Sequence, residues 1–324
     1  MRQLTCSVEH WSLKRPFHIT GYRFDEVAIL QASIRDGDEL GQGEATGIYY
    51  LGETGSSLLA QAQSVGGAIA DGASREDLLR LLPAGGARNA LDCALWDLEA
   101  KQAGERVWEM LGIRSEPVVT VNTVGIGSPA EMANVASELD TDHIKVKLDG
   151  DMPLERIRAV RNARPDAVIV VDVNAGWTFA QLTALAPRFR DLGVAMIEQP
   201  LPRGGDSELE GYEAPLPLCA DESCLDTNEF EQAAQRYQMI NIKLDKTGGL
   251  TEALRLAAMA RDSGIEIMVG NMVGTSLGMA PGFVIAQQCR FVDLDGALLL
   301  RRDRDHPMRY SGGVVMPPPI ELWG

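Results

Sequence analysis

The sequence predicts an α/β protein in which a (β/α)8 TIM-type barrel, residues 115–300, follows a smaller α+β domain, residues 1–114. Two observations carry this prediction. Short apolar runs recur every 22 to 26 residues between residues 147 and 243, and each run ends in a charged residue. This spacing suits one strand, one helix and two loops, and continuous apolar runs suit parallel strands that are buried on both faces.

The first domain is expected to begin with antiparallel strands and to continue with helices. Residues 27–30 and 32–34 are strand-like, and residues 36–38 predict a hairpin turn. Between residues 54 and 103 apolar residues recur at intervals of three and four, which is typical of helices. The segments 19–24 and 48–54 mix aromatic, polar and glycine residues. We interpret both as lid loops over a pocket, with plain surface turns as the alternative.

The barrel strands and helices are expected in regular alternation. The eight strands are predicted at residues 118–122, 143–148, 168–171, 194–197, 216–220, 239–242, 266–269 and 291–295. Helical patterns lie between them, for example at residues 153–164, 180–192 and 251–263. The tail, residues 301–324, contains three consecutive prolines and cannot continue the barrel, so we expect it to return to the N-terminal domain.

Composition excludes several classes of partner. The formal net charge of -16 argues against nucleic acid and anionic membranes, which both require clustered basic residues. The first residues lack an apolar signal core, and no apolar run approaches the roughly 20 residues that span a bilayer. The five cysteines are scattered and odd in number, which favours buried thiols and a reducing, cytoplasmic location.

Three of the predicted strands end in a carboxylate, namely Asp172, Glu198 and Asp221. Charged groups at the C-terminal ends of successive barrel strands are typical of an active site. Three oxygen ligands without histidine or cysteine suit one Mg²⁺ ion and not zinc. The alternative is that these acids merely cap the helices that follow, but the lysines nearby would then lack partners.

Two further strands end in a lysine, and these are Lys147 on strand two and Lys243 on strand six. The pKa of a lysine is lowered near a dication and a second lysine, which makes it a suitable general base. Two such lysines on opposite sides of one carbon could exchange its proton, as in a racemase or epimerase. Lys145 shares a strand face with Lys147 and is predicted to direct a fixed positive charge at a substrate carboxylate. Asn174 and Glu222 are expected to support the site from behind.

Five short motifs occur together at these strand ends, and they are Lys145-Val146-Lys147, Asp172-Val173-Asn174, Glu198-Gln199-Pro200, Ala220-Asp221-Glu222-Ser223 and Asn241-Ile242-Lys243. In this combination the chain resembles the enolase superfamily, in its muconate-lactonising subgroup. The resemblance implies an enolase-like architecture, in which the α+β domain caps the barrel.

Within that subgroup the chain resembles the dipeptide epimerases of the L-Ala-D/L-Glu type, through Asp293-Leu294-Asp295-Gly296, residues 88–97 and residues 243–249. The resemblance implies that Asp293 and Asp295 bind the α-ammonium group of a dipeptide, a pairing that is physically favourable. It also implies inversion of the Cα atom of the C-terminal residue, with its carboxylate held by Mg²⁺, in the recycling of murein peptides.

Two residues are expected to set the preferred dipeptide. In relatives that act on Ala-Glu, the first loop is expected to offer an arginine to the glutamate side chain, and Arg23 is the candidate here. Its neighbours Tyr22 and Phe24 would instead favour a larger or more apolar side chain. Asn271, after strand seven, is the other candidate.

Alternatives within the subgroup are an N-acylamino acid racemase, an o-succinylbenzoate synthase and a cycloisomerase. Asp293 and Asp295 argue against them, because their substrates lack a free ammonium group. Outside the subgroup, a Schiff-base aldolase that uses Lys243 and a non-catalytic binding protein remain as alternatives. The sequence leaves a homo-oligomer open.

Overall fold

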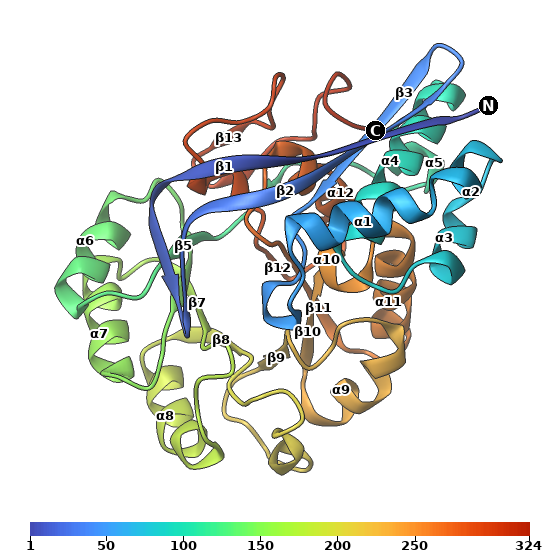
Figure 1. The fold of residues 1–324 in the computed structure, drawn as a ribbon. Coiled ribbons are helices and arrows are strands. Elements are labelled where there is room, and N and C mark those ends of the chain that lie inside the picture. Colours follow the sequence, from blue (N-terminus) through green and yellow to red (C-terminus); the bar gives the residue numbers. More distant parts are fainter.

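The computed structural model describes all 324 residues and confirms the predicted fold class, with eight parallel barrel strands and an α+β domain at the start of the chain (Figure 1). The first domain begins with the antiparallel strands β1 (Gln3–Ile19), β2 (Tyr22–Asp36) and β3 (Glu39–Ala45), in that spatial order. The predicted turn at residues 36–38 joins β2 to β3. Gly37 has a φ of 63° there, which glycine adopts without strain.

The helices of this domain follow the sheet along the chain, and they are η1 (Tyr49–Leu51, a 3-10 helix), α1 (Gly55–Ser64), α2 (Gly66–Ala70), α3 (Arg75–Leu81), α4 (Gly86–Ala103) and α5 (Val107–Met110). The predicted apolar stripe of α4 is buried against the sheet. Two glycines of β3 permit this close packing. A Cβ atom on Gly41 would lie 2.1 Å from Ala94 O, and one on Gly43 would lie 2.2 Å from Ala90 O.

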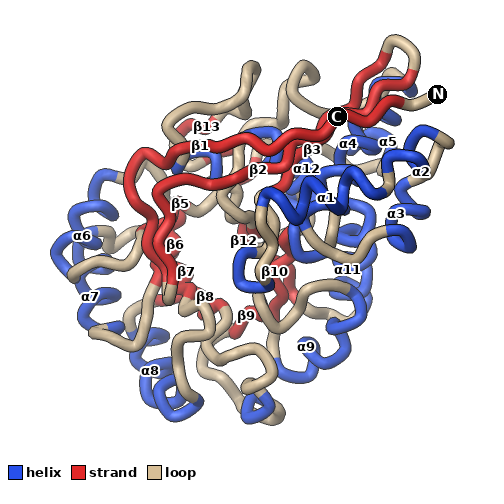
Figure 2. The backbone as a smooth tube through the Cα atoms, in the orientation of Figure 1, coloured by secondary structure: helices blue, strands red, loops and turns tan.

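The barrel strands form the ring at the centre of Figure 2, and they are β5 (Asn122–Val124), β6 (His143–Lys147), β7 (Val168–Asp172), β8 (Val194–Glu198), β9 (Leu218–Ala220), β10 (Met239–Lys243), β11 (Glu266–Gly270) and β12 (Phe291–Val292). Adjacent strands are parallel and follow the chain order. The amide of Val121 donates to Val292 O at 2.8 Å, which joins the last strand to the first and closes the barrel.

The crossover helices surround this ring, and they are α6 (Pro129–Glu138), α7 (Pro153–Ala163), α8 (Phe179–Asp191), α9 (Phe230–Arg236), α10 (Leu244–Thr247), α11 (Leu250–Asp262) and α12 (Ser276–Ala286). β8 and β12 are followed by short 3-10 segments in place of an α-helix, and these are η2 (Ser207–Leu209) and η4 (Gly296–Leu299). A third such segment, η3 (Thr227–Glu229), precedes α9. The outer faces of the strands and the helices share one large apolar core.

The barrel interior holds a separate apolar layer, made of Val121, Val170, Met196, Cys219, Met239, Met268 and Phe291. Six of these residues lie in the consecutive strands β7 to β12, and Val121 directly precedes β5, the next strand around the ring. Side chains two positions apart on a strand point the same way. The residue two positions after each of them therefore points to the same side of its strand, one layer nearer the C-terminal mouth of the barrel.

Two sequence predictions were wrong in detail. The first barrel strand is not residues 118–122, because β4 (Val118–Val119) pairs with β14 (Val314–Val315) outside the barrel and β5 takes that place. Residues 19–24 are not an irregular loop either. They form the end of the β1–β2 hairpin, with Ile19 opposite Tyr22. A bulge between Ser12 and Phe17 bends this long hairpin toward the barrel mouth (Figure 1).

The C-terminal tail runs back along the barrel to the first domain. Its strands β13 (Tyr310–Ser311) and β14 (Val314–Val315) form a small sheet with β4. Near the end of the chain, Trp323 Nε1 donates to Cys93 O at 3.0 Å, and the Gly324 amide donates to Asp97 Oδ1 at 2.7 Å. Both acceptors belong to α4, so the tail contacts the helix that backs the first sheet.

The helices of the structure are each too short or too polar to cross a lipid bilayer. All five cysteines are free thiols, and Cys93, Cys219 and Cys224 are buried. Burial raises the pKa of each of these three thiols above its usual value, so they stay protonated and behave as small apolar side chains.

Candidate active site

The charged residues predicted at the strand ends lie together at the mouth of the barrel. Lys147, Asp172 and Glu198 are direct neighbours in register on β6, β7 and β8. Asp221 follows β9, and Lys243 ends β10. β6 and β10 are four strands apart in the ring of eight and lie on opposite sides of it (Figure 2). The two lysines at their ends therefore approach the mouth from opposite sides. All five side chains are buried.

Each of these lysines is paired with a carboxylate. Lys147 Nζ lies 2.6 Å from Asp172 Oδ2 and 3.1 Å from Asn174 Oδ1. Lys243 Nζ lies 2.6 Å from Asp221 Oδ2. Burial alone would lower the pKa of Lys243, but the charges of Asp221 and Glu198 raise it well above the usual value.

The three predicted metal ligands do not converge in ligand geometry, and their pKa values differ. Burial, and then the charge of Asp172, raise the pKa of Glu198 above its usual value. Burial would raise the pKa of Asp172, yet the positive charges of Lys147 and Lys145 lower it to about 2. Lysines likewise lower the pKa of Asp221 against the effect of burial. Each of the three carboxylates forms an ion pair with a lysine ammonium group.

The donor atoms nevertheless fit a hard cation. Glu198 Oε2 and Asp221 Oδ1 are buried and have no hydrogen-bond donor. Lys145 Nζ lies 2.7 Å from Glu198 Oε2, and Lys246 Nζ lies 2.7 Å from Asp221 Oδ1, so each oxygen is in an ion pair. Buried carboxylate oxygens in this state are suitable ligands for Mg²⁺, which binds oxygen donors almost exclusively.

Lys145 occupies the centre of this charge cluster. It is almost completely buried, and its Nζ lies 2.8 Å from Asp293 Oδ2, 2.7 Å from Glu198 Oε2 and 3.1 Å from Asp172 Oδ2. Burial would lower its pKa, but these three carboxylates raise it well above the usual value. Lys145 therefore stays protonated and forms ion pairs both with the predicted metal ligands Asp172 and Glu198 and with Asp293, which follows β12.

Several residues that the sequence reasoning missed fix the carboxylates. Asn241 Nδ2 donates to Glu198 Oε1 at 2.7 Å, and Gln199 Oε1 accepts from the amide of Asp221 at 2.9 Å. Lys246 is fully buried, and its Nζ donates to the carbonyl oxygens of Asp221, Cys224 and Asn241. Asn241 could have been found from its position, because it lies two residues before Lys243 on the same side of β10.

Asn174 and Glu222 lie beside the cluster as predicted supports. Asn174 Nδ2 donates to Glu222 Oε1 at 3.4 Å, and the amide of Asn174 donates to Asp172 Oδ1 at 2.9 Å. Glu222 Oε2 is buried without a partner. Burial, and then the charges of Asp221 and Asp172, raise the pKa of Glu222 to about 8.

Asp293 and Asp295 lie close to the cluster, but protein groups already bind both of them. Asp293 Oδ2 accepts from Lys145, and Asn271 Nδ2 donates to Asp293 O at 2.6 Å. Asp295 Oδ2 accepts from the amide of Thr123 at 2.7 Å. Burial, and then the charge of Asp293, raise the pKa of Asp295 to about 7.

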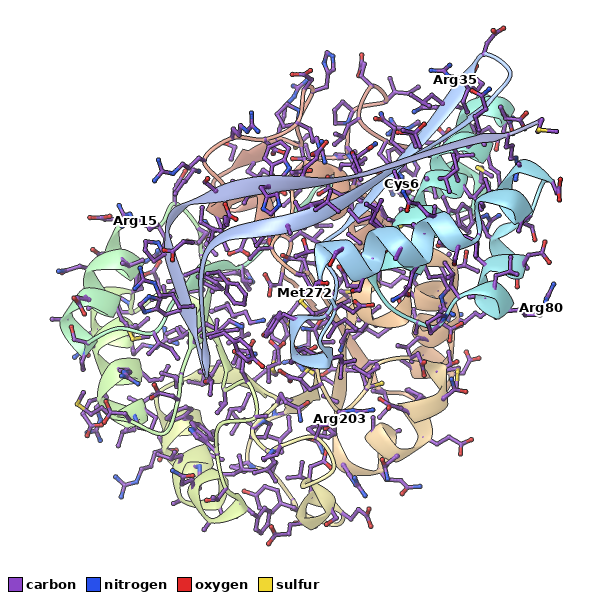
Figure 3. All side chains as sticks on the ribbon, viewed as in Figure 1. Cys6, Arg15, Arg35, Arg80, Arg203 and Met272 are labelled. Atoms are coloured by element: carbon purple, nitrogen blue, oxygen red, sulfur yellow. The ribbon has the colours of Figure 1, made fainter.

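A cavity of about 220 Å³ opens between the barrel mouth and the first domain. Lys147, Lys243, Asn174 and Asn271 form its barrel side, together with Met272, which is labelled in Figure 3. The first domain contributes a mainly apolar wall made of Phe17, Ile19, Phe24, Val27, Ala28 and Tyr49, with Glu26 and Glu53 beside it. Asp293 and Asp295 are not part of the lining.

Arg23 is not part of this lining either, so the structure does not place it where the sequence predicted. Tyr22 and Phe24 contact Tyr49, with ring centroids 4.6 and 5.2 Å apart. Arg23 lies between them in the strand and therefore points to the other face of the hairpin. There it pairs with the exposed Asp25 at 3.2 Å and lines a separate groove with Arg15, which is labelled in Figure 3.

Comparison with known proteins identifies the family. The model described as enolase C-terminal domain-like matches residues 129–320, and that of the mandelate racemase / muconate lactonizing enzyme N-terminal domain matches residues 2–112. The chain belongs to the enolase superfamily. Its sequence is 43% identical to that of the L-Ala-D/L-Glu epimerase of Escherichia coli K12, over 97% of this chain and 99% of the relative. It is 45% identical to the N-acetyl-D-glutamate racemase of a Pseudoalteromonas species, over 76% and 79% of the two chains.

Solved structures of superfamily members agree with this fold. An enolase family member from Agrobacterium tumefaciens, with bound sodium and L-Ala-L-Glu, has a TM-score of 0.97 and 41% identity, with all of both chains covered. A dipeptide epimerase from Methylococcus capsulatus, complexed with Mg and L-Arg-D-Lys, has a TM-score of 0.90 and 31% identity over 97% and 96% of the chains. This superfamily member is an isomerase of the epimerase and racemase class.

Proposed function

We propose that this enzyme is a Mg²⁺-dependent dipeptide epimerase that inverts the Cα atom of the C-terminal residue. One observation carries the proposal, namely that Lys147 and Lys243 line one cavity from opposite sides of the barrel mouth. Two bases that face each other across a carbon atom can remove its proton on one side and return a proton on the other. The dipeptide-bound relatives support a dipeptide as the substrate.

Asp172, Glu198 and Asp221 would hold one Mg²⁺ ion. The buried oxygens of Glu198 and Asp221 that accept no hydrogen bond, and the Mg-complexed relative, support this assignment. When bound, the cation offsets the negative charge that develops on the substrate carboxylate. One lysine takes the Cα proton, and the electron pair moves toward the carboxylate. The other lysine then protonates the opposite face. Lys145 adds a fixed positive charge, because the carboxylates around it keep it protonated.

L-Ala-D/L-Glu is the first substrate we propose. One relative, at 43% identity, is an L-Ala-D/L-Glu epimerase, and the structure of another, at 41% identity, contains bound L-Ala-L-Glu. Asp293 and Asp295 would receive the ammonium group of the alanine residue, with Asn271 fixing Asp293 from the cavity side. On this specificity the enzyme would serve the recycling of murein peptides.

An apolar C-terminal residue is the second candidate, and it rests on the cavity wall. Phe17, Ile19 and Phe24 form this wall on the hairpin side, while Arg23 faces away from it. A carboxylate side chain would lose its hydration there without gaining a cationic partner, whereas an apolar side chain would gain contact area.

The test is proton NMR of a dipeptide panel in D₂O with Mg²⁺, in which loss of the C-terminal Cα proton signal reports exchange. L-Ala-L-Glu is compared with L-Ala-L-Phe, L-Ala-L-Leu and N-acetyl-L-glutamate, which lacks the free ammonium group. Fastest exchange in L-Ala-L-Glu supports the first candidate, and fastest exchange in the apolar dipeptides supports the second. Exchange in N-acetyl-L-glutamate alone would contradict both and identify an N-acylamino acid racemase.

A further inference from the structure

A short segment of the first domain, residues 46–51, is bound to the barrel by two hydrogen bonds. Thr46 Oγ1 donates to Val273 O at 2.6 Å, and the amide of Gly47 donates to Asp245 Oδ1 at 2.8 Å. Val273 follows β11 and Asp245 follows β10, so the segment is anchored beside Lys243. Within the first domain, Glu53 Oε2 accepts from the amide of Ile48 at 2.7 Å. The segment therefore holds its side chains in a fixed place over the barrel mouth.

Two adjacent tyrosines of this segment lie beside the active site, and only the first of them lines the cavity. Tyr49 lines the cavity that contains Lys147 and Lys243. The ring of Tyr50 packs edge-on against Tyr49, with centroids 5.3 Å apart. The hydroxyl oxygen of Tyr50 is buried and has no hydrogen-bond partner. A buried phenol hydroxyl is nearly always paired, so an unpaired one beside an active site indicates a partner that arrives with the ligand.

The surroundings of this hydroxyl show what kind of ligand atom it can bind. Burial raises the pKa of Tyr50, Asp221 and Glu222 raise it further, and Lys243 opposes them. The phenol therefore stays protonated and can donate. The unpaired oxygens Asp221 Oδ1 and Glu222 Oε2 do not accept its proton. The donor thus remains available for a ligand oxygen on the Asp221 and Lys243 side of the mouth.

We propose that Tyr50 is a catalytic residue whose hydroxyl donates a hydrogen bond to the carboxylate of the residue that is being epimerised. The inference rests on the proposed epimerase function. When the Cα proton passes to a lysine, its electron pair moves toward this carboxylate, and the hydroxyl keeps its own proton throughout. A fixed donor gains strength as negative charge grows on its acceptor, so it stabilises the transition state more than the bound substrate.

The test compares Tyr50→Phe with the wild-type holoenzyme in the deuterium-exchange assay, on the panel dipeptide that the wild type exchanges fastest. We expect kcat to fall by about 10- to 100-fold while KM changes by less than about threefold, because the lost bond is strongest in the transition state. The melting temperature should be unchanged or higher, since the substitution removes an unpaired buried hydroxyl. Calorimetric titration with MgCl₂ alone should give the wild-type affinity.

Tyr212→Phe is the matched control, because Tyr212 packs against Phe179 outside the site and its loss of a hydroxyl should leave kcat unchanged. A wild-type kcat in Tyr50→Phe would overturn the assignment. So would a lower kcat that comes with weaker Mg²⁺ binding or a lower melting temperature, which would make Tyr50 a structural residue. If the wild type exchanges no dipeptide of the panel, the proposed function fails and the assignment fails with it.

Discussion

Asp245 offers a quantitative test of how the first domain is joined to the barrel. It is buried after β10, its Oδ1 accepts from the amide of Gly47, and Asn89 donates a second hydrogen bond to it. Burial is the largest influence on this carboxyl and raises its pKa from 3.8 to about 6. The substitution Asp245→Asn removes the titration and keeps an acceptor oxygen of similar size.

The sign follows from linkage between protonation and folding. Because the pKa is higher in the folded protein, the folded state holds the proton more tightly than the unfolded state. The resulting stabilisation is complete below pH 3.8 and is lost as the pH rises through about 6. The full difference corresponds to about 3 kcal/mol, at about 1.4 kcal/mol per pH unit.

The assay is urea denaturation of the wild type and Asp245→Asn at a series of pH values from 4 to 7. All other groups titrate alike in both proteins, so the difference in unfolding free energy isolates Asp245. We expect the wild type to lose about 2.4 kcal/mol relative to the variant across this range, because the first part of the full difference is lost below pH 4. Asp25→Asn is the control, because Asp25 is exposed and its variant should follow the wild type. A difference that does not change with pH would refute the reasoning.

Three further predictions concern the active site. Lys147→Ala and Lys243→Ala should each lower the epimerisation rate by at least about 100-fold with the fold kept, measured by NMR and circular dichroism; a wild-type rate in either would contradict the two-base mechanism. Asn241→Ala should weaken Mg²⁺ binding by about 10- to 100-fold in calorimetry, because Asn241 orients Glu198. Unchanged affinity would remove Asn241 from the metal site. Phe24→Arg should raise the ratio of L-Ala-L-Glu to L-Ala-L-Phe turnover by about tenfold, since it puts a cation in the cavity wall; an unchanged ratio would separate the hairpin from side-chain selection.

The strand-end residues could be predicted from the sequence because their signal is local and repeated. Each apolar run marks a strand, and the charged residue at its end, such as Asp172 or Glu198, must lie at the barrel mouth in any fold of this class. Lys147 and Lys243 were found for the same reason. Their positions depend on strand count and direction alone, which the spacing of the runs already determines. Their roles in metal binding and proton transfer stay predictions.

Most of the structural features that the sequence did not predict depend on contacts between residues that are distant in the chain. Val118 and Val119 look like the start of a barrel strand, but they pair with Val314 and Val315 at the far end of the chain. Lys246 looks like an ordinary helical lysine, and only the folding of α10 beneath Asp221 buries it. No local pattern distinguishes either case, because the partner lies about 200 residues away for the valines and 25 residues away for Lys246.

The position of Arg23 was missed for a different reason, since its signal was present. Tyr22, Arg23 and Phe24 alternate along one strand, so Arg23 cannot share a face with its neighbours. Treating residues 19–24 as an irregular loop hid that alternation. With the hairpin recognised, the sequence itself would have put the aromatic side chains on one face and the arginine on the other.

On the proposed function, the barrel would supply the chemistry and the first domain the selectivity, and the two domains are joined unequally. Around β3 the first domain is tied to the barrel by buried charges, where Glu44 Oε2 accepts from Thr275 and Arg304. That side fixes residues 46–51 and the tyrosines next to Lys243. At the hairpin end, one hydroxyl of Thr20 is shared between two carbonyl oxygens, at 3.2 Å each. Residues such as Phe24 are half-exposed there, so substitutions cost little burial and leave the strand-end carboxylates untouched. Substrate preference can therefore change at the hairpin while the proton-transfer machinery stays the same.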